Sequence, residues 1–185
     1  MERSFGAIAD LIRLHAQHTP DHAALADANR TLDYRAFDAL MDRIAASLQR
    51  DGLKAGDAIA ICASSSVNYA AVFLGALRAG VAVAPLAPGS TPASLARMIE
   101  DADARILFSD TSAAEVIGPA NEGGIPRVAL DGSQVGRGID EWLAPAGARP
   151  EAVEVQPGWA FNIIYSSGTT GEPKGIVQGH GMRWA

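Results

Sequence analysis

The chain has 185 residues and a mass of 19.2 kDa, which is enough for one substantial domain with a buried core. It is 48% hydrophobic and 19% charged, and this composition excludes a disordered or low-complexity polymer. Its net charge of -6 and pI near 5.1 repel phosphodiester backbones, so we expect no general nucleic-acid binding.

The first elements predicted along the chain are two helices separated by a hairpin. A helix is expected from Phe5 to Gln17, closed by Pro20, with one apolar face made of Phe5, Ile8, Leu11, Ile12 and His15. The segments 24–26 and 30–32 flank a turn and predict a short hairpin. Asp33 is a predicted N-cap for a second helix, which ends before Gly52. Its expected inward residues are Phe37, Leu40, Met41, Ile44 and Leu48.

From Asp57 onward, short apolar runs typical of covered parallel strands alternate with helical segments. We expect strands at 58–63, 81–84, 105–108, 127–130 and 161–165. Ser64 to Ser66 supply caps for a helix over 67–79, and Thr91 caps a helix that runs from Pro92 to about 101. This alternation predicts an α/β domain with right-handed crossovers. Residues 131–158 are expected to form a surface connection with one short helix near Trp142.

The single cysteine, Cys62, excludes a disulfide framework and a multi-cysteine metal cluster. It fits a reducing compartment, so we expect a cytoplasmic protein. The four histidines show no metal-binding spacing, and no metal ligands are predicted. The amino terminus has no uninterrupted apolar stretch of the kind found in a secretory signal. The most apolar segment, 67–87, is broken by Asn68, Arg78 and Pro85, which predicts a buried helix and strand and no transmembrane span.

The stretch from Tyr165 to Gly175 carries the strongest functional pattern. It packs three glycines, four hydroxyls and Lys174 into eleven residues between two apolar runs. Glycines allow backbone N–H groups to converge on one point, hydroxyls add donors for phosphate oxygens, and lysine adds a compact positive charge. Lys174 is one of only two lysines, with Lys54, among 15 basic residues. The alternative of a flexible Ser/Gly linker fits poorly with a position between two strands.

Two familiar catalytic loops can be tested against these residues. A Walker-type loop requires glycine before the lysine and serine or threonine after it, whereas Pro173 and Gly175 occupy those positions. A nucleophile elbow requires Gly-x-Ser-x-Gly, and neither Ser166 nor Ser167 has the upstream glycine. The sequence therefore favours a phosphate-binding loop of another kind over serine hydrolysis.

Four segments together resemble the ANL superfamily of adenylate-forming enzymes, which includes acyl- and aryl-CoA ligases, adenylation domains of non-ribosomal peptide synthetases, and luciferases. The eleven residues from Tyr165 resemble the phosphate-binding signature of that superfamily. The segments Leu74–Leu86, Thr31–Phe37 and Glu100–Leu107 resemble further family segments in the same order. The resemblance implies that residues 1–185 form the first α/β subdomain of the large N-terminal adenylating domain, with a mostly parallel sheet flanked by helices.

The resemblance also implies a two-step reaction. A carboxylate attacks the α-phosphate of ATP, with Mg²⁺, to give an acyl-adenylate, and the thiol of coenzyme A then displaces AMP to give a thioester. Binding of the β- and γ-phosphates is carried over to Ser166, Ser167, Gly168, Thr169, Thr170, Gly171 and Lys174. Of these, Thr170 and Lys174 would stabilise transition-state charge, and no residue is assigned as catalytic beyond that. His180 corresponds to a histidine near the acyl pocket, or else it is a core-packed or exposed histidine.

The order Gly168-Thr169-Thr170-Gly171 is more usual in CoA ligases, which favours an acid–thiol ligase with a role such as fatty acid metabolism. The alternatives are an amino-acid adenylation domain of a peptide synthetase and a non-catalytic nucleotide- or partner-binding module. In the family the C-terminal domain and most of the acyl pocket lie downstream, so we expect this polypeptide alone to form no acyl-adenylate. We also expect unpaired sheet edges of such a truncated chain to favour a homodimer.

Overall fold

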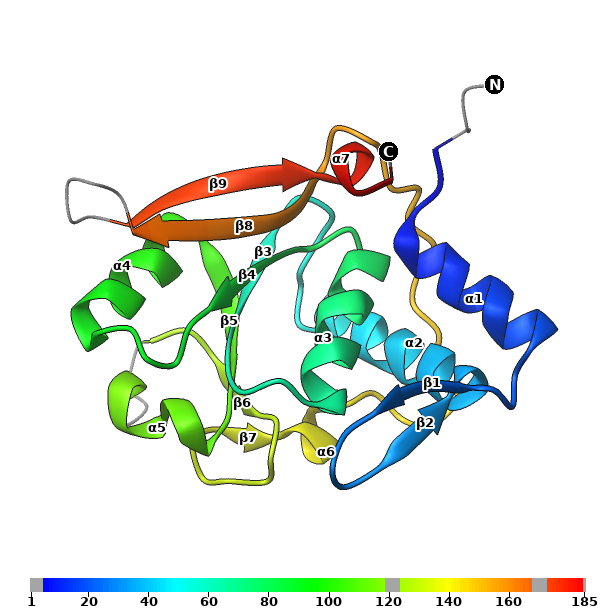
Figure 1. Cartoon of the computed structure of the whole chain (residues 1–185), viewed down its shortest axis with the longest axis horizontal. Helices are drawn as coiled ribbons and strands as arrows, with labels where there is room; N and C mark the ends of the chain where they lie inside the picture. Colours follow the sequence, from blue (N-terminus) through cyan, green and yellow to red (C-terminus); the bar gives the residue numbers. More distant parts are fainter. Residues whose placement is uncertain (1–4, 119–123, 168–172, 185) are drawn as a thin grey trace.

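The computed structural model describes residues 5–118, 124–167 and 173–184. Helices in these ranges are α1 (Ile8–His18), α2 (Tyr34–Arg50), α3 (Val67–Arg78), α4 (Pro92–Asp101), α5 (Thr111–Ile117), α6 (Ile139–Trp142) and α7 (His180–Trp184). The strands are β1 (Ala23–Ala26), β2 (Thr31–Asp33), β3 (Ala58–Cys62), β4 (Ala82–Leu86), β5 (Ala104–Ser109), β6 (Arg127–Ala129), β7 (Arg137–Gly138), β8 (Ala160–Ser167) and β9 (Pro173–Gly179). Figure 1 shows their arrangement along the chain.

The predicted α/β architecture is confirmed. A seven-stranded sheet has the order β7-β6-β5-β3-β4-β8-β9, and its pairs are parallel except for β8 with β9. β1 and β2 form the predicted antiparallel hairpin beside α2. The run β3-α3-β4-α4-β5-α5-β6 places successive strands on both sides of β3, as in doubly wound sheets.

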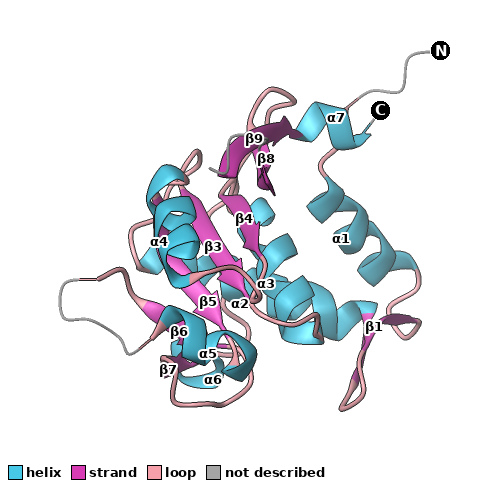
Figure 2. Ribbon diagram, turned by 60° about the vertical axis from the view of Figure 1, so that its left-hand side comes forward, coloured by secondary structure: helices cyan, strands magenta, loops and turns pink. Residues whose placement is uncertain are grey.

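Two hydrophobic cores cover the two faces of the sheet. Figure 2 shows α4 and α5 on one side of β3, β4 and β5, with α2 and α3 on the other. The larger core, on the α2 and α3 side, contains Phe37, Met41, Ile44, Leu48, Ile59, Ile61, Phe108 and Trp142. The smaller core, on the α4 and α5 side, contains Ala60, Cys62, Leu86, Leu95, Met98, Leu107 and Ala113. All five residues of β3 are buried, which explains its continuous apolar sequence.

Three predicted helix caps are confirmed in detail. Asp33 Oδ1 accepts a hydrogen bond from the N–H of Ala36 at 2.7 Å, at the start of α2. Ser66 Oγ accepts one from the N–H of Tyr69 at 3.1 Å, and Thr91 Oγ1 accepts one from the N–H of Ser94 at 3.2 Å. Each bond satisfies a backbone donor that the first helical turn leaves free. These local signals therefore set the starts of α2, α3 and α4.

The expected inner face of the first helix is wrong in part. Leu11 is 38% exposed and His15 is also exposed, while Ala9 is buried. The helix begins at Ile8, later than predicted, and Ile8 and Ile12 of the predicted inner face pack against the larger core beside Ala9. His15 instead stacks on the ring of Tyr34, with 4.8 Å between ring centroids.

The segment 131–158 is more than the surface connection that the sequence predicts. The short helix near Trp142 is present as α6, but Ile139, Trp142 and Leu143 are buried in the larger core. The Trp142 ring packs edge-on against Phe108 at 5.1 Å, and its indole N–H donates to Asp51 at 2.7 Å. The segment thus closes the α2 side of the sheet. The sequence analysis also missed α5 and the edge strand β7.

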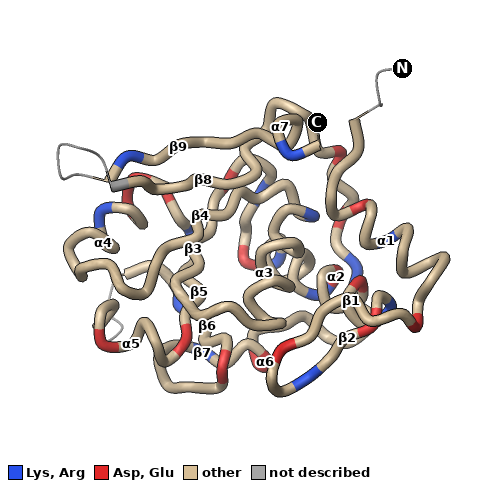
Figure 3. Tube along the Cα trace, viewed as in Figure 1, with Lys and Arg blue, Asp and Glu red and all other residues tan. Residues whose placement is uncertain are grey.

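A network of charged side chains joins the first three helices. Arg78 on α3 lies 2.5 Å from Asp38 and 2.9 Å from Asp42, both on α2. Arg13 on α1 also hydrogen-bonds Asp42. The side chains of Arg78 and Asp42 are only 8% and 6% exposed. Figure 3 shows acidic and basic residues interspersed around α1 and α2. We call Arg78, Asp38 and Asp42 the α2–α3 charge network.

We predict that Gly75→Ala destabilises the fold by about 1–3 kcal/mol. A Cβ at position 75 of α3 would lie 2.7 Å from Cγ2 of Ile44 on α2 and 3.3 Å from the Met41 carbonyl oxygen. Alanine favours a helix over glycine by about 1 kcal/mol, but Ile44 is fully buried and cannot move away. Urea unfolding measures the change. An unfolding free energy equal to or above wild type would contradict this close helix crossing.

No helix in the described part of the chain is both long enough and apolar enough to cross a membrane. The most apolar segment of the sequence consists of α3 and β4, as predicted.

Candidate functional site

The predicted phosphate loop lies at the end of the β8–β9 hairpin. The strands pair Tyr165 with Gly175, Ser166 with Lys174 and Ser167 with Pro173. The loop therefore joins two strands, as the sequence analysis expected. Four of its candidate residues, Gly168, Thr169, Thr170 and Gly171, lie outside the described residues. The site is built here from the residues that flank them.

Ser166 and Lys174 are brought together by the strand register. They are directly opposite each other on the two strands, and both are exposed. Side chains that are directly opposite on antiparallel strands share a face, with Cβ atoms about 5 Å apart. A hydroxyl and an ammonium at this distance are two donors suited to the oxygens of one polyphosphate. The hairpin geometry is thus consistent with the predicted combination of hydroxyl and ammonium donors around the loop.

Tyr165 anchors the loop end of this hairpin to α4. Its hydroxyl oxygen lies 2.7 Å from Oδ2 of Asp101 and 3.0 Å from the carbonyl oxygen of Met98. Burial raises the pKa of Tyr165, and the hydrogen bond to Asp101 raises it further. Tyr165 is therefore a protonated donor at neutral pH. The contact between Tyr165 and Asp101 was not predicted, because the two residues are 64 positions apart in the sequence.

His180 follows β9 as the first residue of α7 and is 3% exposed. Its ring packs edge-on against Phe161 of β8 at 5.2 Å. Within the described residues neither ring nitrogen has a hydrogen-bond partner, and the same holds for Oδ1 of the buried Asn162. Buried polar atoms without partners are uncommon in folded proteins. Placement of His180 in an acyl pocket stays a prediction.

We expect the stability of the chain to fall at acidic pH because of His180. Burial lowers the pKa of His180, so the unfolded state takes up a proton at a higher pH than the folded state. Stability is then complete above the unfolded pKa of about 6.5 and declines as pH falls, by at most about 1.4 kcal/mol per pH unit. Urea unfolding of wild type and His180→Gln at pH 7.5 and 5.5 isolates this contribution. An identical free-energy difference between the two proteins at both pH values would contradict it.

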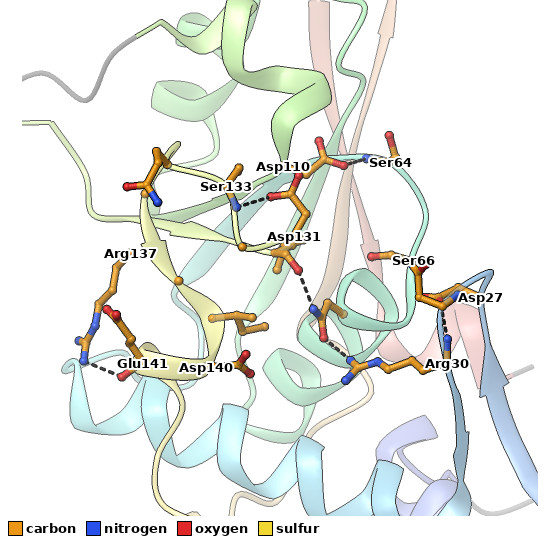
Figure 4. A pocket seen from close by; sticks show the side chains of 18 residues that line it. Asp27, Arg30, Ser64, Ser66, Asp110, Asp131, Ser133, Arg137, Asp140 and Glu141 are labelled. Carbon is orange, nitrogen blue, oxygen red and sulfur yellow. Dashed lines mark hydrogen bonds between the residues drawn. The ribbon is translucent and has the colours of Figure 1, made fainter.

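A cavity of about 680 Å³ is a second candidate site, which was not predicted from the sequence. It lies beyond the carboxyl ends of β3, β5 and β6, where ligands often bind in open α/β sheets. Figure 4 shows its carboxylates. Asp110 accepts from the N–H of Ser64 at 2.9 Å, Asp131 from the N–H of Thr111 at 2.9 Å, and Asp27 from the N–H of Val67 at 2.9 Å.

These carboxylates serve the fold. Asp110 caps α5 by accepting from the N–H of Ser112, and the bond to Asp27 satisfies the first residue of α3. Backbone hydrogen bonds lower the pKa of Asp27. Burial acts to raise the pKa of Asp131, but hydrogen bonds from Ser133 and Thr111 outweigh it and lower the pKa. The hairpin therefore remains the better candidate site. In the described part of the chain, no group of three His, Cys, Asp or Glu side chains is placed to hold a metal ion.

Known proteins resemble this chain over almost its whole length. A family model described as AMP-binding enzyme matches residues 12–183. Gramicidin S synthase 2 of Aneurinibacillus migulanus is 27% identical over 92% of this chain and 4% of its own length. The 3-hydroxybenzoate–CoA ligase of Aromatoleum is 28% identical over 90% of this chain and 32% of its own length.

A solved structure shows the same likeness. VinN in complex with 3-methylaspartate superposes with a TM-score of 0.80 and 32% identity, over 95% of this chain and 48% of VinN. The chain thus spans less than half the length of each of these three proteins. The family match itself covers almost all of the chain, including the hairpin.

Proposed function

The chain belongs to the AMP-binding enzyme family, and on that premise we propose that it supplies the phosphate-binding part of an ATP-dependent acid–thiol ligase. The observation that carries this proposal is the β8–β9 hairpin, which sets an exposed Ser166 opposite an exposed Lys174 at the ends of the predicted loop. ATP use follows from the family. Domain limits of 1–185 within a larger adenylating domain are part of the same proposal.

In the proposed first step, a carboxylate oxygen attacks the α-phosphorus of ATP. The new P–O bond replaces the bond to pyrophosphate, which leaves with both electrons of that bond. Ser166 and Lys174 would hold the β- and γ-phosphates, and the Lys174 ammonium would balance charge that grows on the departing pyrophosphate. Within the described residues no group of three His, Cys, Asp or Glu side chains is placed to hold Mg²⁺; when bound with the nucleotide, the ion would supply positive charge beside the phosphates.

In the proposed second step, the thiolate of coenzyme A attacks the acyl carbon and AMP leaves. Support for a CoA ligase comes from the 3-hydroxybenzoate–CoA ligase among the relatives and from Thr169, since a threonine at this position is more usual in CoA ligases. No described residue is assigned to the acyl group except His180, whose unpartnered ring nitrogens lie beside the hairpin.

The test is carboxylate-dependent exchange of pyrophosphate into ATP by the protein purified at its native length. The panel contains simple aromatic and aliphatic acids together with amino acids, and coenzyme A is added in a second assay that follows loss of the free thiol. Exchange with a simple acid followed by thiol consumption is the expected result. Exchange with amino acids alone would replace the proposal by peptide-synthetase adenylation, the activity suggested by gramicidin S synthase 2. Exchange with no acid would overturn both.

A further inference from the structure

The end of α4 meets the loop end of the phosphate hairpin through one carboxylate. Oδ2 of Asp101, the last residue of α4, lies 2.7 Å from the Tyr165 hydroxyl on β8. The same hydroxyl lies 3.0 Å from the Met98 carbonyl oxygen, one turn earlier on α4. Tyr165 thus meets two oxygens of the final turn of α4, and the negatively charged one is the nearer. We call the contact between Asp101 and Tyr165 the α4 latch.

Gly175 makes room for this latch on the opposite strand. It pairs directly with Tyr165, and a Cβ at position 175 would lie 2.9 Å from Asp101 Oδ2 and 3.2 Å from Cε1 of Tyr165. The Asp101 carboxylate therefore rests against both strands of the hairpin. Tyr165 and Gly175 are the pair that immediately precedes the Ser166–Lys174 pair, so the latch holds both strands one residue from the proposed phosphate donors.

Local helix stability does not account for Asp101. A carboxylate in the last turn of a helix faces the negative end of the helix dipole and is unfavourable there. The side chain is exposed, so it fills no core space either. The hydrogen bond to Tyr165 is the interaction that this position provides. Asp101 also belongs to the segment Glu100–Leu107, which the proposed reaction leaves without a role.

We propose that Asp101 is a positioning residue, which acts through Tyr165 to orient the register-paired Ser166 and Lys174 toward the polyphosphate of MgATP. This inference rests on the proposed function. Without the latch, the loop end of the hairpin is free to twist relative to α4. Ser166 and Lys174 then lose their common orientation toward the polyphosphate. Misplacement of donors by about 1 Å weakens binding and catalysis without unfolding a protein. The effect should therefore fall on MgATP and spare the carboxylic acid.

The test uses Tyr165→Phe and Asp101→Asn in the protein at its native length. For Tyr165→Phe we expect the KM for MgATP in pyrophosphate exchange to rise about 10-fold, with the KM for the acid changed less than about twofold. Asp101→Asn should have a smaller effect of the same kind, because the amide oxygen still accepts a hydrogen bond. The double variant should be no worse than Tyr165→Phe alone, since both changes remove one contact. Asp103→Asn is the matched control, because it removes a nearby exposed carboxylate that forms no side-chain hydrogen bond to the hairpin within the described residues.

Two measurements separate failure of the latch from failure of the proposed function. Calorimetric titration with MgATP needs no acid substrate, and amide hydrogen exchange over 163–167 and 173–177 needs no ligand. Weaker MgATP binding and faster amide hydrogen exchange in Tyr165→Phe support the latch if both are absent in Asp103→Asn. They do so even if no acid supports turnover. If Tyr165→Phe binds MgATP and exchanges its amide hydrogens as wild type does, the latch proposal is overturned, whatever the activity. A wild-type protein that binds no MgATP would overturn the latch proposal and the proposed function together.

Discussion

In the protein at its native length, replacing Lys174 by alanine should lower the rate of pyrophosphate exchange by roughly 10²–10³-fold, or about 3–4 kcal/mol of transition-state stabilisation. Lys174 is exposed at the start of β9, opposite Ser166, and is the described cation nearest in sequence to the predicted loop. Its ammonium is proposed to balance charge on the departing pyrophosphate. Steady-state exchange with saturating acid and varied MgATP gives kcat and KM separately.

The chain offers a matched control for this experiment. Lys54 is the only other lysine in the sequence, and it is exposed in the connection between α2 and β3. Lys54→Ala removes the same charge at a distance from the hairpin and should leave exchange unchanged. Lys174→Arg should recover only part of the activity, because a planar guanidinium does not reproduce a compact ammonium. Equal activity of Lys174→Ala and Lys54→Ala would remove Lys174 from the proposed mechanism.

Replacing Arg78 by methionine should cost about 3 kcal/mol of unfolding free energy. The change fills a similar volume but removes the cation that lies 2.9 Å from Asp42 and 2.5 Å from Asp38. Asp42 is 4% exposed, so its charge cannot be solvated by water. Arg13 still contacts Asp42, which keeps the loss below the largest values known for broken buried pairs. For a domain of this size, the melting temperature should fall by roughly 6–12 °C.

The exposed pair Arg35–Asp21 is the control for this prediction. Its two atoms lie 2.9 Å apart, as close as those of Arg78 and Asp42, but its side chains are 67% and 81% exposed. Arg35→Met should change stability by less than about 1 kcal/mol, because water screens and replaces the interaction. Calorimetry of both variants compares one geometry in two environments. Similar losses in the two variants would mean that burial of the α2–α3 charge network adds nothing.

Features that depend on neighbouring residues could be predicted from the sequence. The caps Asp33, Ser66 and Thr91 satisfy N–H groups three residues away, and each is present. The buried strand β3 was readable from its unbroken apolar run. Asp110 before α5 is a cap of the same kind, so α5 was also predictable from the sequence.

Features that depend on distant residues could not be predicted in this way. Trp142 of α6 is buried because it packs against Phe108 of β5, and the surrounding Gly- and Pro-rich segment does not indicate this contact. The inner face of α1 is occupied by Ala9 and not by Leu11, because small residues allow helices to approach closely. Asp101 and Tyr165 are 64 residues apart, and no local sequence pattern around either residue indicates that they are in contact.

The two hydrophobic cores differ in size, and the segment that packs on the smaller core should unfold first. The α4 layer is held by a few inward side chains such as Leu95 and Met98, whereas α2 and α3 share the larger core and its charge network. Segments with fewer buried apolar contacts unfold locally at lower free energy than the global transition. We therefore expect α4 to detach as a separate cooperative unit. Because the latch residue Asp101 ends α4, the Tyr165 hydroxyl would then lose this contact while β8 stays paired with β4, so the orientation of Ser166 and Lys174 can vary independently of global stability.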